Sequence, residues 1–187
     1  MSRYESSDRA YHDRRHLEEC LEQLAAARHL LRRPDEAEAA IWFHDAVYDP
    51  RADDNEERSA DLADDLLGTA GASTEDLAEI RRLILATGHR GGRNPQDDAA
   101  VVTDVDLSIF GSDPARFDEY ERDIRREYAF ATEADFRRRR AQILEAFLAR
   151  PSIYATRWFI ERLEAKARAN LARSIEALRR EPGTGAN

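Results

Sequence analysis

The sequence predicts a single all-helical domain, and three observations carry that prediction. Ala, Leu, Arg and Glu, all good helix formers, dominate a chain with 8 Gly, 6 Pro and 8% aromatic residues. Apolar residues recur at three- and four-residue spacing, and no segment shows the alternation of a half-buried strand. At 187 residues and 42% hydrophobic content, one domain can bury a core without disulfides. We expect a bundle of about seven to eight helices over residues 1–187, with an ordered core over about 8–180 and a polar tail at 181–187.

The first two predicted helices contain the residues of greatest chemical interest. Leucines at 17, 21, 24 and 31 form the apolar stripe of a helix over 11–31. Pro34 suits the first turn of a second helix, which should end at Asp49-Pro50 because the residue before a proline disfavours the helical conformation. Apolar residues surround much of this helix, which predicts a buried central helix with His44 and Asp45 in its middle.

The later helices are predicted from their start and stop signals. Capping residues or Asp-Pro pairs begin them, and glycine or proline ends them. In chain order, a third helix covers 54–68, a fourth opens with Ser73-x-x-Asp76, a glycine-rich loop covers 88–95, a fifth ends at Gly111, a sixth starts at Asp113-Pro114, a seventh runs from Thr132-x-x-Asp135 to Arg150-Pro151, and the last ends near 178.

Charge and composition exclude several classes of partner. The net charge of −9 disfavours nucleic acid as a partner, although a bound cation would still permit a phosphorylated small molecule. The run Arg137 to Arg140 is expected to wrap around a helix and to be mostly a solvated face. No stretch is apolar enough for a membrane span or a signal peptide, so we expect a cytoplasmic protein with no membrane partner. The single cysteine, Cys20, excludes a disulfide framework and is expected to be a packed thiol.

Ionisable residues at apolar positions suggest a metal site. His44 and Asp45 stand together in the most apolar segment, where two buried ionisable groups are costly without a partner. Asp106 shares a predicted helix face with apolar residues and should point toward the core, whereas Asp104 should point elsewhere. His12 and His16 are four residues apart, so their side chains should share a helix face. Imidazole and carboxylate groups are normal ligands of divalent metal ions.

The order His16, His44-Asp45, Asp106 resembles the HD superfamily of metal-dependent phosphohydrolases, and more narrowly a group of small bacterial predicted HD phosphohydrolases. The resemblance implies an all-helical HD fold in which these four residues bind a divalent metal ion (Mn, Fe, Co, Ni, Zn or Mg). The matching stretches span nearly the whole chain: Tyr11-His12-x-x-x-His16, Trp42-Phe43-His44-Asp45, Asp54-Asn55-Glu56-Glu57-Arg58-Ser59, Ala86-Thr87-x-His89, Asp104-Val105-Asp106-Leu107, Arg125-x-Glu127-Tyr128 and Glu164-x-x-Ala167-Arg168-x-Asn170-Leu171.

The resemblance also implies catalytic roles. The pair His12 and His16 is similar to the His-Asn-x-x-His segment of cyclic nucleotide phosphodiesterases, which makes His12 a candidate general acid. Asp13 replaces the Asn of that segment, so the analogy does not extend to cyclic nucleotides. Asp45 is the residue expected to orient the attacking water. His89 is a candidate second-metal ligand or phosphate contact, or else a plain loop histidine.

Further residues are candidates for contact with the substrate. Tyr48, Glu56, Arg58 and Ser59 closely follow the His-Asp pair, although Glu56 can equally favour its helix N-terminus and Tyr48 can equally be a core residue. Arg90 and Arg93 could contact phosphate or belong to a surface loop. The function predicted from these residues is hydrolysis of a phosphate ester or anhydride of a nucleotide by a metal-activated water.

Other functions stay open at this stage. A non-catalytic HD module could bind or sense a nucleotide with the same residues. A di-iron centre for oxygen chemistry would need ligands beyond these four, and only His89 is an obvious source. A plain helical interaction domain would leave His44, Asp45 and Asp106 without a partner. A homodimer could form through Trp158 and Phe159, which are expected to be exposed.

Overall fold

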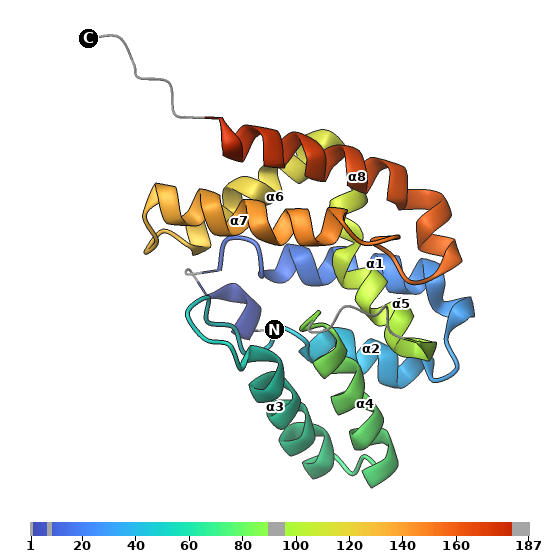
Figure 1. Cartoon of the computed structure of the whole chain (residues 1–187). Helices are drawn as coiled ribbons and strands as arrows, with labels where there is room; N and C mark the ends of the chain where they lie inside the picture. Colours follow the sequence, from blue (N-terminus) through green and yellow to red (C-terminus); the bar gives the residue numbers. More distant parts are fainter. Residues whose placement is uncertain (1, 7–8, 90–95, 181–187) are drawn as a thin grey trace.

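The predicted all-helical fold is confirmed. The computed structural model describes residues 2–6, 9–89 and 96–180, which form helices and turns with no strand among them. Eight α-helices and three short 3₁₀ helices in this part of the chain pack as one bundle (Figure 1). In chain order they are η1 (Ser2–Glu5), α1 (Arg14–Ala27), η2 (Arg28–Leu30), α2 (Pro34–Phe43), α3 (Asn55–Thr69), α4 (Thr74–Ala86), α5 (Asp97–Asp106), η3 (Leu107–Gly111), α6 (Pro114–Glu127), α7 (Glu133–Leu148) and α8 (Arg157–Arg179).

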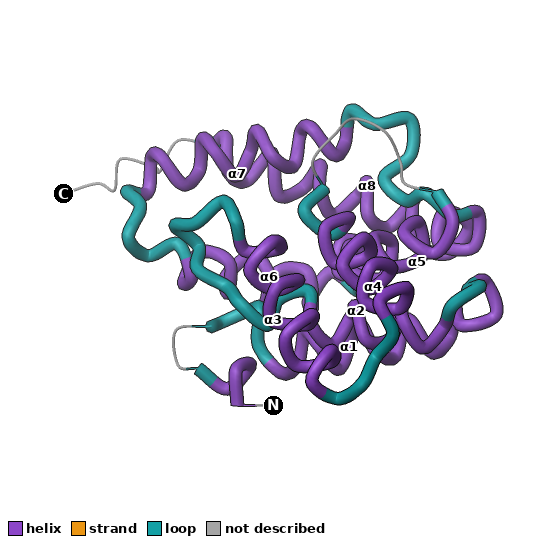
Figure 2. Tube along the Cα trace, turned by 90° about the horizontal axis from the view of Figure 1, so that it is seen from below, coloured by secondary structure: helices purple, strands orange, loops and turns teal. Residues whose placement is uncertain are grey.

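The bundle has a central group of helices with a pair on either side. Helices α1, α2 and α5 contact one another at the centre. Helices α3 and α4 form a hairpin that projects from one end, and α7 and α8 lie side by side at the other (Figures 1 and 2). No described helix combines the length and apolar character needed to cross a bilayer.

Local capping signals place several helix starts where the sequence predicts them. The Ser73 side chain accepts a hydrogen bond from the Asp76 backbone N–H, and Thr132 does the same for Asp135. Each satisfies one of the unpaired amides in the first turn of its helix. The proline that opens α2 and the one that opens α6 lie in the first turn, where the missing N–H costs nothing.

The first helix begins later than predicted, at Arg14. Asp13 precedes it in extended conformation, and its carboxylate accepts the backbone N–H groups of Arg15 and His16 at 2.9 and 3.2 Å. The prediction that His12 and His16 share a helix face is therefore wrong, because His12 lies before the cap. The acidic residue that departs from the phosphodiesterase pattern has a structural role, since Asp13 is the N-cap of α1.

The second helix ends sooner than predicted, so the His-Asp pair is not in the middle of a helix. His44 is the C-cap of α2 and Asp45 lies in the following turn. The His44 ring Nδ1 donates to the carbonyl of Ile41 at 2.8 Å. The guanidinium of Arg9 donates to the carbonyls of Asp45 and Ala46 at 2.6 and 3.2 Å. These side-chain donors replace the backbone donors that a longer helix would supply.

The fifth helix changes to a 3₁₀ helix after Asp106, and Gly111 is its last residue. A Cβ atom on Gly111 would lie 2.6 Å from Leu163 Cβ, so only glycine lets η3 approach α8 this closely. Asp104 is 1% exposed, and its carboxylate accepts the backbone N–H groups of Ala155 and Thr156 at 2.7 Å each. Asp104 therefore fixes the start of α8.

The predicted exposure of Trp158 and Phe159 is wrong. Phe159 is fully buried, stacked on Tyr154 at 6.0 Å between ring centroids, and Trp158 is half-buried against it. The helix α8 turns this pair toward the core, so the two side chains do not form an exposed aromatic pair. Arg140 also leaves the solvated arginine face, because its guanidinium is buried against the Tyr120 hydroxyl and Glu121.

Candidate metal centre

Two histidines and two carboxylates converge at the centre of the bundle. His16 comes from α1, His44 and Asp45 from the end of α2, and Asp106 from the end of α5. The two histidine Nε2 atoms are 3.1 Å apart. Asp45 Oδ2 lies 3.4 Å from His16 Nε2 and 3.1 Å from His44 Nε2. Asp106 Oδ1 lies 3.4 and 3.5 Å from the same two nitrogens. The structure thus brings together the four predicted ligands.

These spacings fit a shared metal ion. Ligand atoms about 2.1 Å from one ion are about 3.0 Å apart at right angles and about 3.4 Å apart at tetrahedral angles. The His44 Nδ1–H is used by the Ile41 carbonyl, which leaves the Nε2 lone pair facing the cluster. Such a backbone partner is the usual way to orient a metal-binding imidazole. The donor set is nitrogen and oxygen, as for Mn, Fe, Co, Ni, Zn or Mg.

The charges of the cluster also suit a divalent cation. Burial alone would lower the pKa of the His44 imidazole, but the carboxylates of Asp45 and Asp106 outweigh it and hold that pKa well above its usual range. Burial likewise favours protonated carboxyl groups, yet the histidines hold the pKa of both aspartates well below normal. Without a metal ion, the histidines and the carboxylates thus stabilise each other's charged forms. A divalent cation carries positive charge into the same space.

His89 lies beside the cluster. Its Nε2 is 2.8 Å from Asp106 Oδ2, the carboxylate oxygen that does not face the other two histidines. The His89 backbone has a φ of +50°, which non-glycine residues adopt only rarely. This conformation aims the ring at Asp106. His89 can therefore orient that ligand or bind a further cation.

Cys20 is a further buried donor near the histidines. Ligand atoms of His16, Cys20, His44 and Asp106 all lie within 4.8 Å of one another, so these residues could hold a metal ion. The Cys20 sulfur, however, lies 3.7 Å from both His16 ring nitrogens. Equal distances place it beside the ring rather than along the direction of the Nε2 lone pair. Cys20 packs against a ligand, and its sulfur is poorly placed to be one.

Glu127 is a residue that the sequence reasoning missed as a functional candidate. Its Oε1 accepts the backbone N–H groups of Ala10, Tyr11 and His12 at 3.0, 2.8 and 2.9 Å. Its Oε2 lies 2.7 Å from His12 Nδ1 and accepts the Tyr48 hydroxyl at 3.0 Å. The only sequence signal was its place in the stretch Arg125-x-Glu127-Tyr128.

The pairing with Glu127 fixes the orientation of His12. Burial would raise the pKa of Glu127, but hydrogen bonds from His12 and the backbone lower it to about 2. An ionised carboxylate can only accept, so His12 Nδ1 carries a proton and Nε2 faces away. The His12 ring stacks on Tyr48 at 4.0 Å and lies 5.8 Å from the His16 ring. A positioned histidine therefore stands next to the metal cluster.

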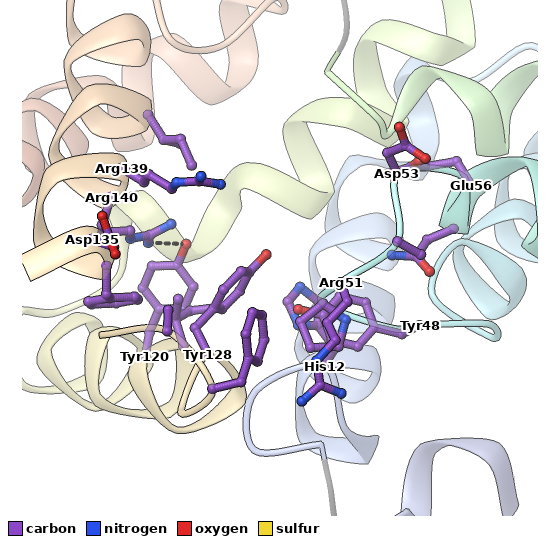
Figure 3. A pocket seen from close by; sticks show the side chains of 18 residues that line it. His12, Tyr48, Arg51, Asp53, Glu56, Tyr120, Tyr128, Asp135, Arg139 and Arg140 are labelled. Carbon is purple, nitrogen blue, oxygen red and sulfur yellow. Dashed lines mark hydrogen bonds between the residues drawn. The ribbon is translucent and has the colours of Figure 1, made fainter. Parts of the chain in front are cut away.

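A cavity of about 680 Å³ opens on the His12 side of the cluster (Figure 3). Of the predicted substrate residues, Tyr48 and Glu56 line it. Ser59 is fully buried, and its hydroxyl bonds to the backbone N–H and carbonyl of Val47 at 3.0 and 3.2 Å. Arg58 is exposed and lies 3.7 Å from Asp54, away from the cavity lining. Arg90 and Arg93 lie outside the described residues.

Comparison of the chain with models of protein families, with curated proteins and with solved structures finds no match. The functional assignment therefore depends on the geometry of the cluster and on the motif resemblance.

Proposed function

We propose that this protein is a metal-dependent phosphohydrolase that cleaves a phosphate ester or anhydride of a nucleotide. The observation that carries the proposal is a set of four ligands, 3.1 to 3.5 Å apart where they meet the histidine nitrogens, beside a histidine held by a buried glutamate. The first element matches metal ligation and the second matches proton transfer. The resemblance of these residues to the HD superfamily is the reason for proposing phosphate hydrolysis as the reaction.

His16, His44, Asp45 and Asp106 would hold the metal ion. When bound, a divalent cation lowers the pKa of a water molecule and polarises a phosphoryl oxygen. The other oxygen of Asp45, Oδ1, accepts no hydrogen bond within the described part of the chain. It is free to accept one from the attacking water and so orient it.

His12 supplies the proton for the leaving group. With Nδ1–H bound to Glu127, the protonated ring presents Nε2–H and passes that proton to the departing oxygen. The carboxylate of Glu127 stabilises the charged ring before transfer and keeps it in one orientation, as the buried aspartate does in a serine protease triad. Tyr48 supports the ring from its face and shares the same carboxylate oxygen.

The test is to measure metal content and phosphate release together. The purified protein is loaded in turn with Mn²⁺, Fe²⁺ and Zn²⁺, desalted, analysed by mass spectrometry and assayed against a panel of nucleotides. We expect near-stoichiometric metal and phosphate release, both lost in Asp45→Ala. His12→Asn should keep the metal and lose turnover. Asp65→Ala, an exposed position on α3, is the control for loss of a carboxylate.

The outcomes separate the competing functions. Failure to bind any of the three metals contradicts the proposal. Metal binding with no turnover of any nucleotide supports the non-catalytic nucleotide-binding module instead. Two metal ions per chain, reduced to one in His89→Ala, would make His89 a second-metal ligand.

A further inference from the structure

The cavity beside His12 is lined by none of the four candidate ligands, and it has an aromatic wall. Phe130 and Ile143 line it although 48% and 49% of their surfaces are exposed. Tyr128 lies next to Phe130, with ring centroids 5.6 Å apart. Large apolar side chains left exposed around a cavity typically mark a place where a ligand binds. Flat rings of this kind suit a nucleobase.

The same cavity contains two arginines without an acidic partner. Arg139 extends from α7 and Arg51 lies across from it, after α2 (Figure 3). Within the described residues, neither guanidinium forms an ion pair or a hydrogen bond, and Arg51 only covers the Phe130 ring at 4.5 Å. These two cations are therefore available to a ligand.

The neighbouring charges on the same wall are already used. Arg140 donates to Glu121 and to the Tyr120 hydroxyl. Asp135 caps α7 through Thr132 and pairs with Arg138 at 2.5 Å. Asp53 and Glu56 also line the cavity, and each has a partner of its own. In a chain with a net charge of −9, Arg139 and Arg51, which have no acidic partner among the described residues, favour an anion beside them. A guanidinium matches a phosphate group with two parallel hydrogen bonds.

We propose, on the basis of the proposed function, that this cavity binds a second phosphate group of the substrate through Arg139 and Arg51. The reacting phosphate lies at the metal cluster and His12, and a group held by Arg139 on the far wall is a different one. The aromatic wall formed by Phe130 and Tyr128 binds the base. The substrate class is thus a nucleotide with phosphate groups at two positions rather than a nucleoside monophosphate.

Calorimetric titration of the full chain tests this assignment. The probes are adenosine 5′-monophosphate and adenosine 3′,5′-bisphosphate, each added to metal-free protein, in which binding is measured without turnover. We expect the bisphosphate to bind at least about tenfold more tightly, and Arg139→Gln to remove most of that advantage. Arg122→Gln is the matched control, because Arg122 is an exposed arginine on α6 that does not line the cavity.

Equal affinities for the two nucleotides, or an advantage that persists in Arg139→Gln, would overturn the second-phosphate site. Phosphate release by the Mn²⁺-loaded wild type is measured in parallel. Arg139-dependent binding without phosphate release keeps the pocket assignment and contradicts the hydrolase. Phosphate release without Arg139-dependent discrimination keeps the hydrolase and contradicts the pocket assignment.

Discussion

Asp104 and Asp106 are two residues apart on α5 and belong to two different buried polar regions. Burial raises the pKa of Asp104 to about 6, although two backbone N–H groups bind it. Burial acts in the same direction on Asp106, but three histidines hold its pKa well below normal. The same residue type on one helix therefore has opposite electrostatic surroundings.

The region around Asp104 is satisfied by the backbone. Glu164 accepts the Ile153 N–H at 3.0 Å, next to the amides that Asp104 accepts. Arg168 donates to the carbonyl of Arg150 at 2.8 Å, and Asn170 donates to that of Phe110 at 2.9 Å. Each side chain compensates a loop or helix end that would otherwise carry unpaired groups. These motif residues shape the fold.

Around Asp106 the imidazole nitrogens and carboxylates face one another instead, although His44 Nδ1 also donates to the Ile41 carbonyl. This contrast distinguishes the two regions. Side chains that bond to backbone groups are satisfied by the fold, whereas nitrogens and carboxylates that face one another can also bind a cation. Four experiments test whether the two regions have different roles.

The largest effect is expected for Asp106→Ala. A structural zinc site of four ligands binds with about 10–16 kcal/mol, so one ligand accounts for about 3–4 kcal/mol, or a few hundredfold in affinity. Metal titration should show that loss. In the metal-free variant the buried histidines lose one of the two carboxylates that balance them, so the free energy of unfolding should also fall, by about 1–3 kcal/mol. Wild-type metal affinity in the variant would place Asp106 with the structural residues.

Asp104→Ala should lower the free energy of unfolding and leave metal binding unchanged. It leaves two buried amides, those of Ala155 and Thr156, without an acceptor, which costs about 2–3 kcal/mol of unfolding free energy. Urea denaturation measures that cost. Metal stoichiometry below the unfolding transition should match wild type, and a loss of metal from the folded variant would show that the two regions are not independent.

Glu127 has both backbone and side-chain partners, so the pH dependence of its contribution to stability tests the same difference. Its folded pKa of about 2 lies below the ordinary 4.5, so its contribution is complete above about pH 4.5 and is lost as pH falls toward 2. Between pH 7 and pH 3 the contribution should fall by about 2 kcal/mol. Unfolding of wild type and Glu127→Gln at both values isolates it, since the variant cannot titrate there. The stability difference between the two proteins should shrink by that amount, and a difference that stays constant would contradict the pairing.

The smallest effect is expected for Cys20→Ala. The thiol is buried next to His16, but its sulfur lies beside the ring. Metal affinity should change less than about threefold, well below the loss expected for a ligand. If removal of the sulfur weakens binding as much as Asp106→Ala does, then Cys20 is a ligand and the side chain must rotate on binding.

The sequence predicts best what is decided locally. Ser73 and Thr132 cap the helices that begin after them. Each cap needs only a side-chain hydroxyl and the backbone N–H three residues later, so it can be predicted from neighbouring residues. His44, Asp45 and Asp106 could be proposed because they stand among apolar residues, and the resemblance to the HD motif added His16 to the set. The exact end of α2 could not be predicted, since it depends on Arg9, which is 36 residues from Asp45. Nor could the role of Glu127 be predicted, because its backbone partners are more than a hundred residues away.

The long sequence separation between His12 and Glu127 affects the order in which the site is assembled. The four ligands are all present once the ribosome has added residue 106, whereas His12 acquires its carboxylate only after residue 127. Contacts that close such long loops depend on the rest of the fold and form slowly. Under the proposed function, cation binding and proton transfer would therefore become possible at different stages of synthesis, because the second requires the early and late segments of the chain to be in contact.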